Sequence, residues 1–388
     1  MSPSVIPYGR QDIRDEDVTA VEAVLRSDWL TQGPAVPRFE AAVAARCGAT
    51  HAVAANSATS SLHLACLALG LKSGDRLWTT PNTFVASANC GRYCGAALDF
   101  VDIDRDSLNL DPVALATKLE QAEKTDCLPR IVVAVDFAGQ SCDMTAIRAL
   151  ADRYGFRVIE DASHAIGARY LSEPVGNGRH ADITVFSFHP VKIITTGEGG
   201  MALCNDAGLA ERMARLRGHG IQRDAAAQAA HGAWYYEQVE LGFNYRMTDM
   251  QAALGGSQLA RLDEYIAARR RLADRYDRLL ADLPLKTPWR DPDADSAWHL
   301  YVIRLDAAAL AKPGRRAVFE RLRAAGIGVN VHYIPVHLQP DYRRLGFAPG
   351  HCPVAEDYYT RALTLPLYPG LTEAEQDRVV EALREALA

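Results

Sequence analysis

Short apolar runs that alternate with helix-like stretches between Ala49 and Leu203 constrain the fold more than any other feature of this sequence. The apolar runs predict strands, and the stretches between them predict helices. Strands are expected at 51–55, 76–80, 98–101, 131–135, 157–159, 182–186 and 201–204, and helices at 60–69, 85–94, 112–122 and 144–154. Repeated units of this length favour an α/β fold with a mostly parallel sheet covered by helices, which binds ligands at the carboxyl ends of its strands.

The pattern changes after Asp249. Apolar residues at helical spacing predict a long amphipathic helix that ends at Leu283-Pro284 and keeps Arg269–Arg271 in solvent; they are Leu259, Leu262, Ile266, Ala273, Tyr276 and Leu280. Strands expected at 298–305 and 329–332, a helix at 315–325 and a last helix opened by the capping box Thr372–Glu375 indicate a smaller α+β unit. We therefore expect an N-terminal arm at 1–11, a large α/β domain at 12–254 and a small α+β domain at 255–388.

Charge and composition exclude several classes of protein. A net charge of −6 over 388 residues gives no basic surface for nucleic acid, and no window reaches the roughly 18 apolar residues of a membrane span. The first residues do not resemble a signal peptide, and the eight cysteines are scattered through a chain too long to need disulfide bridges. Cys90 and Cys94 could share a metal, but no second Cys/His pair has zinc-site spacing, so we expect buried thiols in a reducing cytoplasm.

Three polar segments follow predicted strands. Glu160 and Asp161 come directly after one strand, where either carboxylate could point into a cleft or simply cap a turn. Lys192 is the one positive charge in the stretch 184–200, near Ser187 and a glycine-rich turn. Apolar surroundings would lower the pKa of such a lysine and free its amine for imine chemistry, although a surface lysine beside a turn is the simpler reading.

The third segment, residues 55–61, lies between a strand and a helix, where small residues let backbone N–H groups approach an anion. Alone it cannot be told from an ordinary helix cap. Neither the P-loop nor the dinucleotide glycine motif follows any strand, which argues against a nucleotidase and a dehydrogenase. Together, a phosphate cradle, a carboxylate and an imine-forming lysine meet the needs of pyridoxal 5′-phosphate (PLP). Their order along the chain is that of the fold-type-I PLP-dependent transferases, the aspartate aminotransferase-like fold.

Longer segments carry a resemblance that covers the whole chain. They are Leu30–Pro34, Asn56–Ser60, Pro81–Asn89, Glu160–His164, Phe186–Lys192, Leu241–Asp249, Val331–Pro335 and Leu365–Pro369. In these segments the sequence resembles the DegT/StrS-type family of PLP-dependent nucleotide-sugar aminotransferases. The residues at 56–60, 187–192 and 332–335 are most similar to those of the branch that makes the 4-amino precursor of pseudaminic acid, UDP-4-amino-4,6-dideoxy-N-acetyl-β-L-altrosamine.

The resemblance implies a role for each matching residue. Lys192 would bind the cofactor covalently and move a proton, Asp161 would pair with the ring nitrogen, Phe84 would stack on the ring, and His164 would approach the ring hydroxyl. Ala58, Thr59 and Ser187 would hold the phosphate, and Asn244 would reach the phosphate in the neighbouring subunit, which implies a homodimer with shared sites. The sugar-nucleotide contacts would come from Tyr8, Leu30, Thr31, Ser57, Ser187, Asn244, His332 and Tyr333.

The resemblance also implies the reaction. Relatives that dehydrate sugars carry His in place of Lys192, so the lysine favours amino transfer. The expected reaction moves an amino group from L-glutamate to the 4-keto group of a UDP-linked 2-acetamido-2,6-dideoxyhexose by ping-pong chemistry. A 3-keto sugar, another 4-keto stereoisomer, or a non-catalytic regulator on the same fold are the alternatives. No metal, membrane or nucleic acid is expected as a partner.

Overall fold

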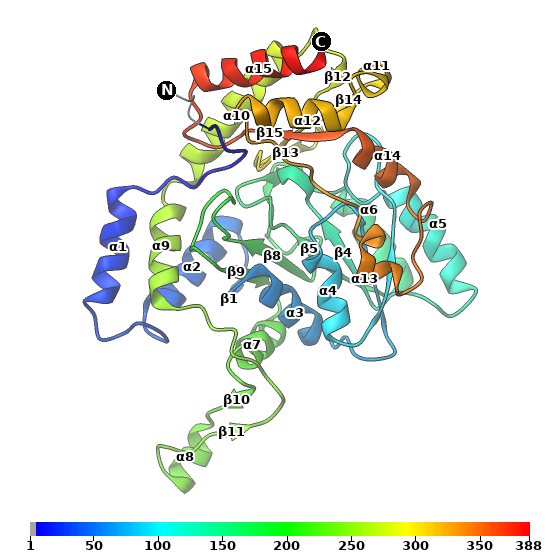
Figure 1. Cartoon of the computed structure of the whole chain (residues 1–388). Coiled ribbons are helices and arrows are strands. Elements are labelled where there is room, and N and C mark those ends of the chain that lie inside the picture. Colours follow the sequence, from blue (N-terminus) through cyan, green and yellow to red (C-terminus); the bar gives the residue numbers. More distant parts are fainter. Residues whose placement is uncertain (1–4) are drawn as a thin grey trace.

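A seven-stranded sheet forms the centre of the computed structural model, which describes residues 5–388 (Figure 1). Across the sheet the strands are β1 (His51–Ala55), β9 (Gly200–Cys204), β8 (Ile183–Ser187), β5 (Arg157–Asp161), β4 (Ile131–Val135), β2 (Arg76–Thr79) and β3 (Ala97–Phe100). β9 is antiparallel to both its neighbours, and every other pair in this sheet is parallel. The expected mostly parallel α/β fold is confirmed.

Helices cover both faces of this sheet because successive strand residues point to opposite sides. In β1, for example, Ala54 packs on one face, and Val53 and Ala55 pack on the other. The face of Val53 is covered by α3 (Ala58–Ala68), α4 (Ala86–Tyr93) and α7 (Ala207–Leu216). The opposite face is covered by α2 (Ala35–Cys47), α5 (Pro112–Glu123), α6 (Met144–Tyr154) and α9 (Asp249–Leu259).

The C-terminal part of the chain forms a smaller layer above the large sheet in Figure 1. Its antiparallel sheet has the order β12 (Leu285–Lys286), β14 (Tyr301–Leu305), β15 (Ala362–Leu365). Its helices are α10 (Leu262–Leu279), α11 (Ala307–Ala311), α12 (Arg315–Ala324), α13 (Pro340–Arg343), α14 (Pro353–Arg361) and α15 (Glu373–Leu387). The capping box of Thr372 and Glu375 opens α15, as predicted.

Short elements connect these layers. β6 (Arg169–Tyr170), β7 (Glu173–Pro174) and β13 (Ala294–Asp295) form a small sheet, and single 3₁₀ turns lie at Phe137–Gly139 and Val336–Leu338. At the N-terminal end, α1 (Asp15–Leu25) packs against α9, where the buried carboxylate of Asp17 accepts hydrogen bonds from Ser257 and Arg261. The chain before α1 reaches the upper layer, because Ile6 is buried there and pairs with Ile327.

Several expectations for the second half of the chain are wrong. Arg269 is not in solvent but is 1% exposed, since its guanidinium donates to three buried carbonyl groups. The amphipathic helix begins at Leu262 rather than before it, because the chain turns between α9 and α10. The strand expected at 298–305 begins only at Tyr301, and residues 329–332 form no strand beyond a single bridge between Asn330 and Thr364.

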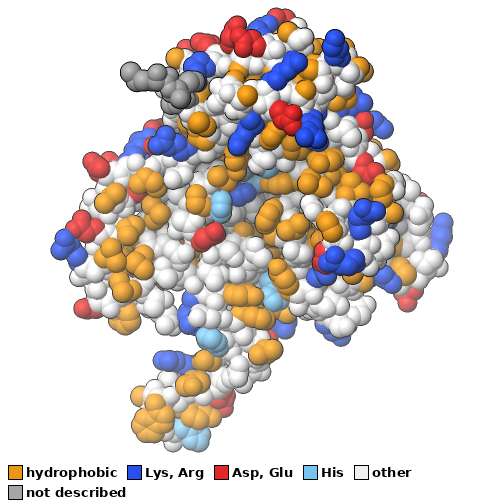
Figure 2. Space-filling model, viewed as in Figure 1, with side chains coloured by type: hydrophobic (Ala, Val, Ile, Leu, Met, Phe, Trp, Pro, Cys, Tyr) orange, Lys and Arg blue, Asp and Glu red, His pale blue; other side chains and the backbone are white. Residues whose placement is uncertain are grey.

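An arm built from β10 (Ile221–Gln222), α8 (Ala225–His231) and β11 (Glu237–Gln238) projects from the lower edge of the molecule (Figure 1). Hydrophobic side chains gather on its surface (Figure 2). Trp234 and Leu241, which belong to the arm and its root, are 80% and 79% exposed. Exposed apolar groups that gather in one place often mark an interaction surface.

No helix within residues 5–388 combines the length and the apolar character needed to cross a bilayer. The eight cysteines are free thiols, and six of them, including Cys90, are buried, whereas Cys94 is half-buried.

Candidate active site

A cavity of about 690 Å³ opens at the carboxyl end of the large sheet, against the segment that follows Asn330. This is the edge at which parallel sheets bind ligands. Figure 2 shows a hollow in the face between the two layers. Eleven residues singled out from the sequence line the cavity: Tyr8, Ser57, Ala58, Thr59, Phe84, Asp161, His164, Ser187, Lys192, His332 and Tyr333.

Asp161 is the last residue of β5 and is 4% exposed. Its Oδ2 accepts a hydrogen bond from Ser87 Oγ at 2.6 Å, and its Oδ1 accepts one from Ser163 Oγ at 2.5 Å. The neighbouring Glu160 points to the other side of the sheet, as strand alternation requires, and Thr184 donates to it there. Burial raises the pKa of Glu160 to about 7. Of these two neighbouring carboxylates, it is that of Asp161 that lines the cavity.

Lys192 lies in the turn that follows β8, where its backbone N–H donates to the carbonyl of His189. Burial lowers the pKa of Lys192 to about 8, and the negative charge of Asp161 partly opposes that shift. The fraction of uncharged amine near neutral pH is therefore much larger than for an ordinary lysine, and the uncharged amine is the form that attacks a carbonyl carbon.

The N-terminus of α3 faces the same cavity. Ser57 caps the helix by accepting from the backbone N–H of Ser60 at 3.1 Å, and the N–H groups of the first helical turn have no acceptor within the helix. Ala58 and Thr59 in this turn and Ser187 at the end of β8 lie around the same end of the cavity. Gly200 makes this arrangement possible, because a Cβ there would lie 2.4 Å from Ala58 N.

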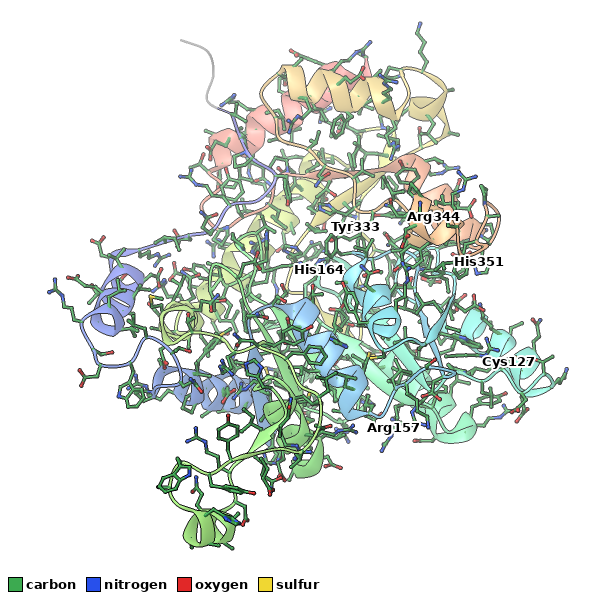
Figure 3. The ribbon with its side chains drawn as sticks, turned by 60° about the horizontal axis from the view of Figure 1, so that its bottom comes forward. Cys127, Arg157, His164, Tyr333, Arg344 and His351 are labelled. Atoms are coloured by element: carbon green, nitrogen blue, oxygen red, sulfur yellow. The ribbon has the colours of Figure 1, made fainter. Side chains whose placement is uncertain are left out.

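His164 and Tyr333 meet at the centre of the molecule, far from Cys127 and Arg157 at its edge (Figure 3). His164 Nδ1 accepts the backbone N–H of Ala138 at 3.2 Å, so the ring carries its hydrogen on Nε2, 3.3 Å from the Tyr333 hydroxyl. Burial lowers the pKa of His164 well below its usual value, with a smaller effect from Lys192. The ring is therefore a neutral hydrogen-bond donor at its Nε2.

Leu30, Thr31 and Asn244 are not among the residues that line this cavity. The carbonyl of Leu30 accepts from the N–H of Asp249, and Thr31 pairs with Thr248, which holds both at the start of α9. Asn244 pairs with Gly218 at the root of the projecting arm and is exposed. Within one chain the structure does not bring these three residues to the site.

Other lining residues were missed by the sequence reasoning. Ser87 and Ser163 hold Asp161, and both stand inside segments that resemble the family, so their neighbourhood was the available signal. His299 falls within the strand expected at 298–305, and nothing in its apolar sequence neighbourhood marks it as one of the residues that line the cavity.

The arrangement fits PLP. A helix N-terminus with two hydroxyl groups beside it suits a phosphate, a buried carboxylate suits a ring nitrogen, and a desolvated lysine amine suits an aldehyde. Because Gly200 has no side chain, β9 packs directly against the first turn of α3.

Comparison with known proteins identifies the family. The sequence profile of the DegT/DnrJ/EryC1/StrS aminotransferases matches residues 11–384. The chain belongs to this family. This confirms the resemblance seen in the sequence. It also confirms that the protein is an aminotransferase that depends on PLP.

Individual members of the DegT family are similar to this protein along nearly its whole length. It is 40% identical to the spore coat polysaccharide biosynthesis protein SpsC of Bacillus subtilis, over 98% of this chain and 96% of that protein. The structure of PseC from Helicobacter pylori, an aminotransferase of pseudaminic acid biosynthesis, superposes with a TM-score of 0.90 at 31% identity and 99% coverage of both chains. The PLP form of Spr1654 from Streptococcus pneumoniae superposes with a TM-score of 0.88 at 29% identity, over 99% of this chain and 98% of that chain.

Proposed function

We propose that this protein transfers an amino group from L-glutamate to the 4-keto group of a UDP-linked 2-acetamido-2,6-dideoxyhexose. The observation that carries the proposal is Lys192, a half-buried residue whose amine has a pKa of about 8 and which lines the same cavity as Asp161. The likeness to PseC along the whole chain supports a sugar of the pseudaminic acid type.

Each residue of the cavity has a separate role in the proposed reaction. PLP supplies an electron sink that stabilises negative charge on the reacting carbon. Asp161 would keep the ring nitrogen protonated, and its two serine donors hold the carboxylate in place. Lys192 Nζ would hold the cofactor and would move the proton at the substrate carbon. Phe84 would cover one ring face, and His164 Nε2 would donate toward the ring hydroxyl.

Several predicted residues that line the cavity would bind the sugar nucleotide. Tyr8, Ser57, Ser187, His332 and Tyr333 line the same cavity as Lys192. His332 is held firmly, since its Nδ1 lies 2.8 Å from the Thr364 hydroxyl. A cavity of about 690 Å³ is within the size range of small-molecule sites.

We further propose that the site is completed by a second copy of the chain. Among the described residues that line the cavity, Lys192 is the one lysine or arginine, whereas PLP and a nucleotide sugar together carry two phosphate-bearing ends. Three predicted site residues are exposed and lie outside the cavity: Asn244, Leu30 and Thr31. The arm next to Asn244 exposes large apolar side chains that a second subunit could cover. A homodimer would cover the arm and bring Asn244 to the neighbouring phosphate.

A second substrate deserves testing, namely another nucleotide-linked ketosugar with a 3-keto group or a different 4-keto configuration. The identity of 40% to SpsC exceeds the 31% identity to PseC, and SpsC is named for spore coat polysaccharide rather than for pseudaminic acid.

The test is a two-step spectroscopic assay. Purified protein loaded with PLP should be yellow, L-glutamate should convert the chromophore, and the correct UDP-ketosugar should restore it. Borohydride should fix the cofactor to Lys192, and Lys192→Ala should abolish both steps. Protein that gains no visible absorbance with PLP would refute the aminotransferase proposal, and biological activity retained by Lys192→Ala would favour a regulator.

A further inference from the structure

Arg269 is a buried positive charge without a negative partner. It is 1% exposed, and its Nη1 donates to the carbonyl groups of Trp298, His299 and Leu367 at 3.0–3.2 Å. Its Nε has no hydrogen-bond partner, and no carboxylate within residues 5–388 forms an ion pair with it. Burial lowers the pKa of Arg269 to about 9, which leaves it charged at neutral pH. An unpaired charge in the interior is costly, and this one lies behind His299, which lines the cavity, so it favours an anion there.

The peptide between Arg269 and the cavity is held in an unusual conformation. Trp298 has a φ of +53°, and the backbone N–H of His299 donates to the carbonyl of Ala138 at 2.9 Å. Gly139 packs so closely that a Cβ there would lie 2.9 Å from Trp298 N. Left-handed backbone at a bulky residue persists where the surroundings impose it, often at functional sites. These contacts fix His299 against the cavity wall.

His299 has spare hydrogen-bonding capacity, unlike the other buried histidines of the cavity. Its side chain lines the cavity, and its ring centroid is 4.4 Å from that of His164. Nδ1 is buried and has no hydrogen-bond partner among the described residues. Nε2 is not among the atoms that are both buried and without a partner. Because a buried unpaired donor is rarer than a buried unpaired acceptor, the hydrogen belongs on Nε2. Burial lowers the pKa of His299, and His164, Lys192, Arg269 and His332 act in the same direction, so the ring is neutral.

We propose that His299 binds the α-carboxylate of the amino donor through Nε2–H, with the charge of Arg269 behind it. This inference rests on the proposed amino transfer and names the part of the site that recognises the amino donor. The α-carboxylate is attached to the carbon that reacts beside Lys192, so it must lie close to that lysine. The sugar portion of the other substrate is uncharged near its keto carbon, and its phosphates lie farther away. A positive field at His299 therefore acts on the donor and not on the ketosugar.

Separate half-reactions test this assignment. His299→Phe keeps the ring bulk against His164 but removes the donor, and His299→Gln keeps a donor. The concentration of L-glutamate that half-saturates conversion of the chromophore should rise about tenfold or more in H299F, the loss expected for a hydrogen bond to a charged group, and less in H299Q. The half-saturating ketosugar concentration should change less than about twofold. Equal weakening of both half-reactions in H299F would overturn the assignment, because the ring would then only shape the cavity.

Binding of glutarate, an unreactive dicarboxylate, gives a readout that does not need turnover. Calorimetry should show glutarate binding to the PLP-loaded wild type, weaker binding to H299F and Arg269→Met, and unchanged binding to Arg270→Met. Arg270 is the matched control, because it is the next residue of α10 but is exposed and pairs with Asp295. Glutarate binding that is absent in the wild type, or equal in H299F, would refute the carboxylate site. Binding that depends on His299 in a protein without amino transfer would refute the proposed function alone.

Discussion

Gly200→Ala provides the sharpest test of how the sheet supports the phosphate end of the site. A Cβ at this position would lie 2.4 Å from Ala58 N and 2.5 Å from Ala58 Cα, and both are backbone atoms at the start of α3. Ordinary contact needs about 3.4 Å or more, so β9 and the helix end must move apart by about 1 Å. Overpacking of this kind costs about 1–3 kcal/mol in stability.

The same displacement should weaken cofactor binding, because it moves the N–H groups of the first turn of α3 relative to Ser187. We expect the apparent Kd for PLP, measured by titration of visible absorbance, to rise at least about tenfold, which corresponds to about 1.4 kcal/mol. Thermal unfolding of the PLP-free protein should show the loss of stability independently.

Gly256→Ala is the matched control. Gly256 lies inside α9 with no atom within 4 Å of a new Cβ, so alanine should stabilise the helix by about 0.5–1 kcal/mol and leave PLP binding unchanged. If G200A bound PLP as tightly as the wild type and melted at the same temperature, the close approach of β9 to α3 would not define the cradle.

Three further changes test other parts of the structure. Ser87→Ala removes the 2.6 Å hydrogen bond to Asp161, and we expect a loss of about tenfold in kcat with little change in folding, measured by steady-state kinetics and circular dichroism. For Lys192, the folded pKa of about 8 lies below the unfolded value of 10.5, so the folded state releases its proton first. The free energy of unfolding of the PLP-free wild type, compared with Lys192→Met in denaturant titrations, should therefore rise between about pH 8 and 10.5, and a flat difference would contradict the buried amine. Thr372→Ala removes the capping box with Glu375 and should lower stability by about 1 kcal/mol without affecting turnover, which a thermal melt and an activity assay would check.

Much of the large sheet could be predicted from local pattern. Each strand from β1 to β5 is short and contains an apolar run, which is the local signal that identifies such strands. The same pattern places Asp161, Ser187 and Lys192 at one sheet edge, because parallel strands end together.

The parts that were missed depend on contacts that no local pattern records. Arg269 sits in a charged run, and only the three carbonyl groups supplied by distant segments explain its burial. His299 becomes a site residue through Ala138 and Arg269, which are far away along the chain. For Asn244, the resemblance points to the neighbouring subunit, which lies outside what one chain can show. Leu30 and Thr31 are expected among the sugar-nucleotide contacts but do not line the cavity of one chain.

Under the proposed homodimer, the projecting arm would link catalysis to protein concentration. If the arm of one subunit completes the phosphate site of another, PLP binds the associated state more tightly than the separated chains. Mass action then requires that the cofactor hold the subunits together and that dilution release it. The yellow colour of the holoenzyme would thus report assembly as well as chemistry, and a cell could switch off stored enzyme simply by keeping PLP scarce.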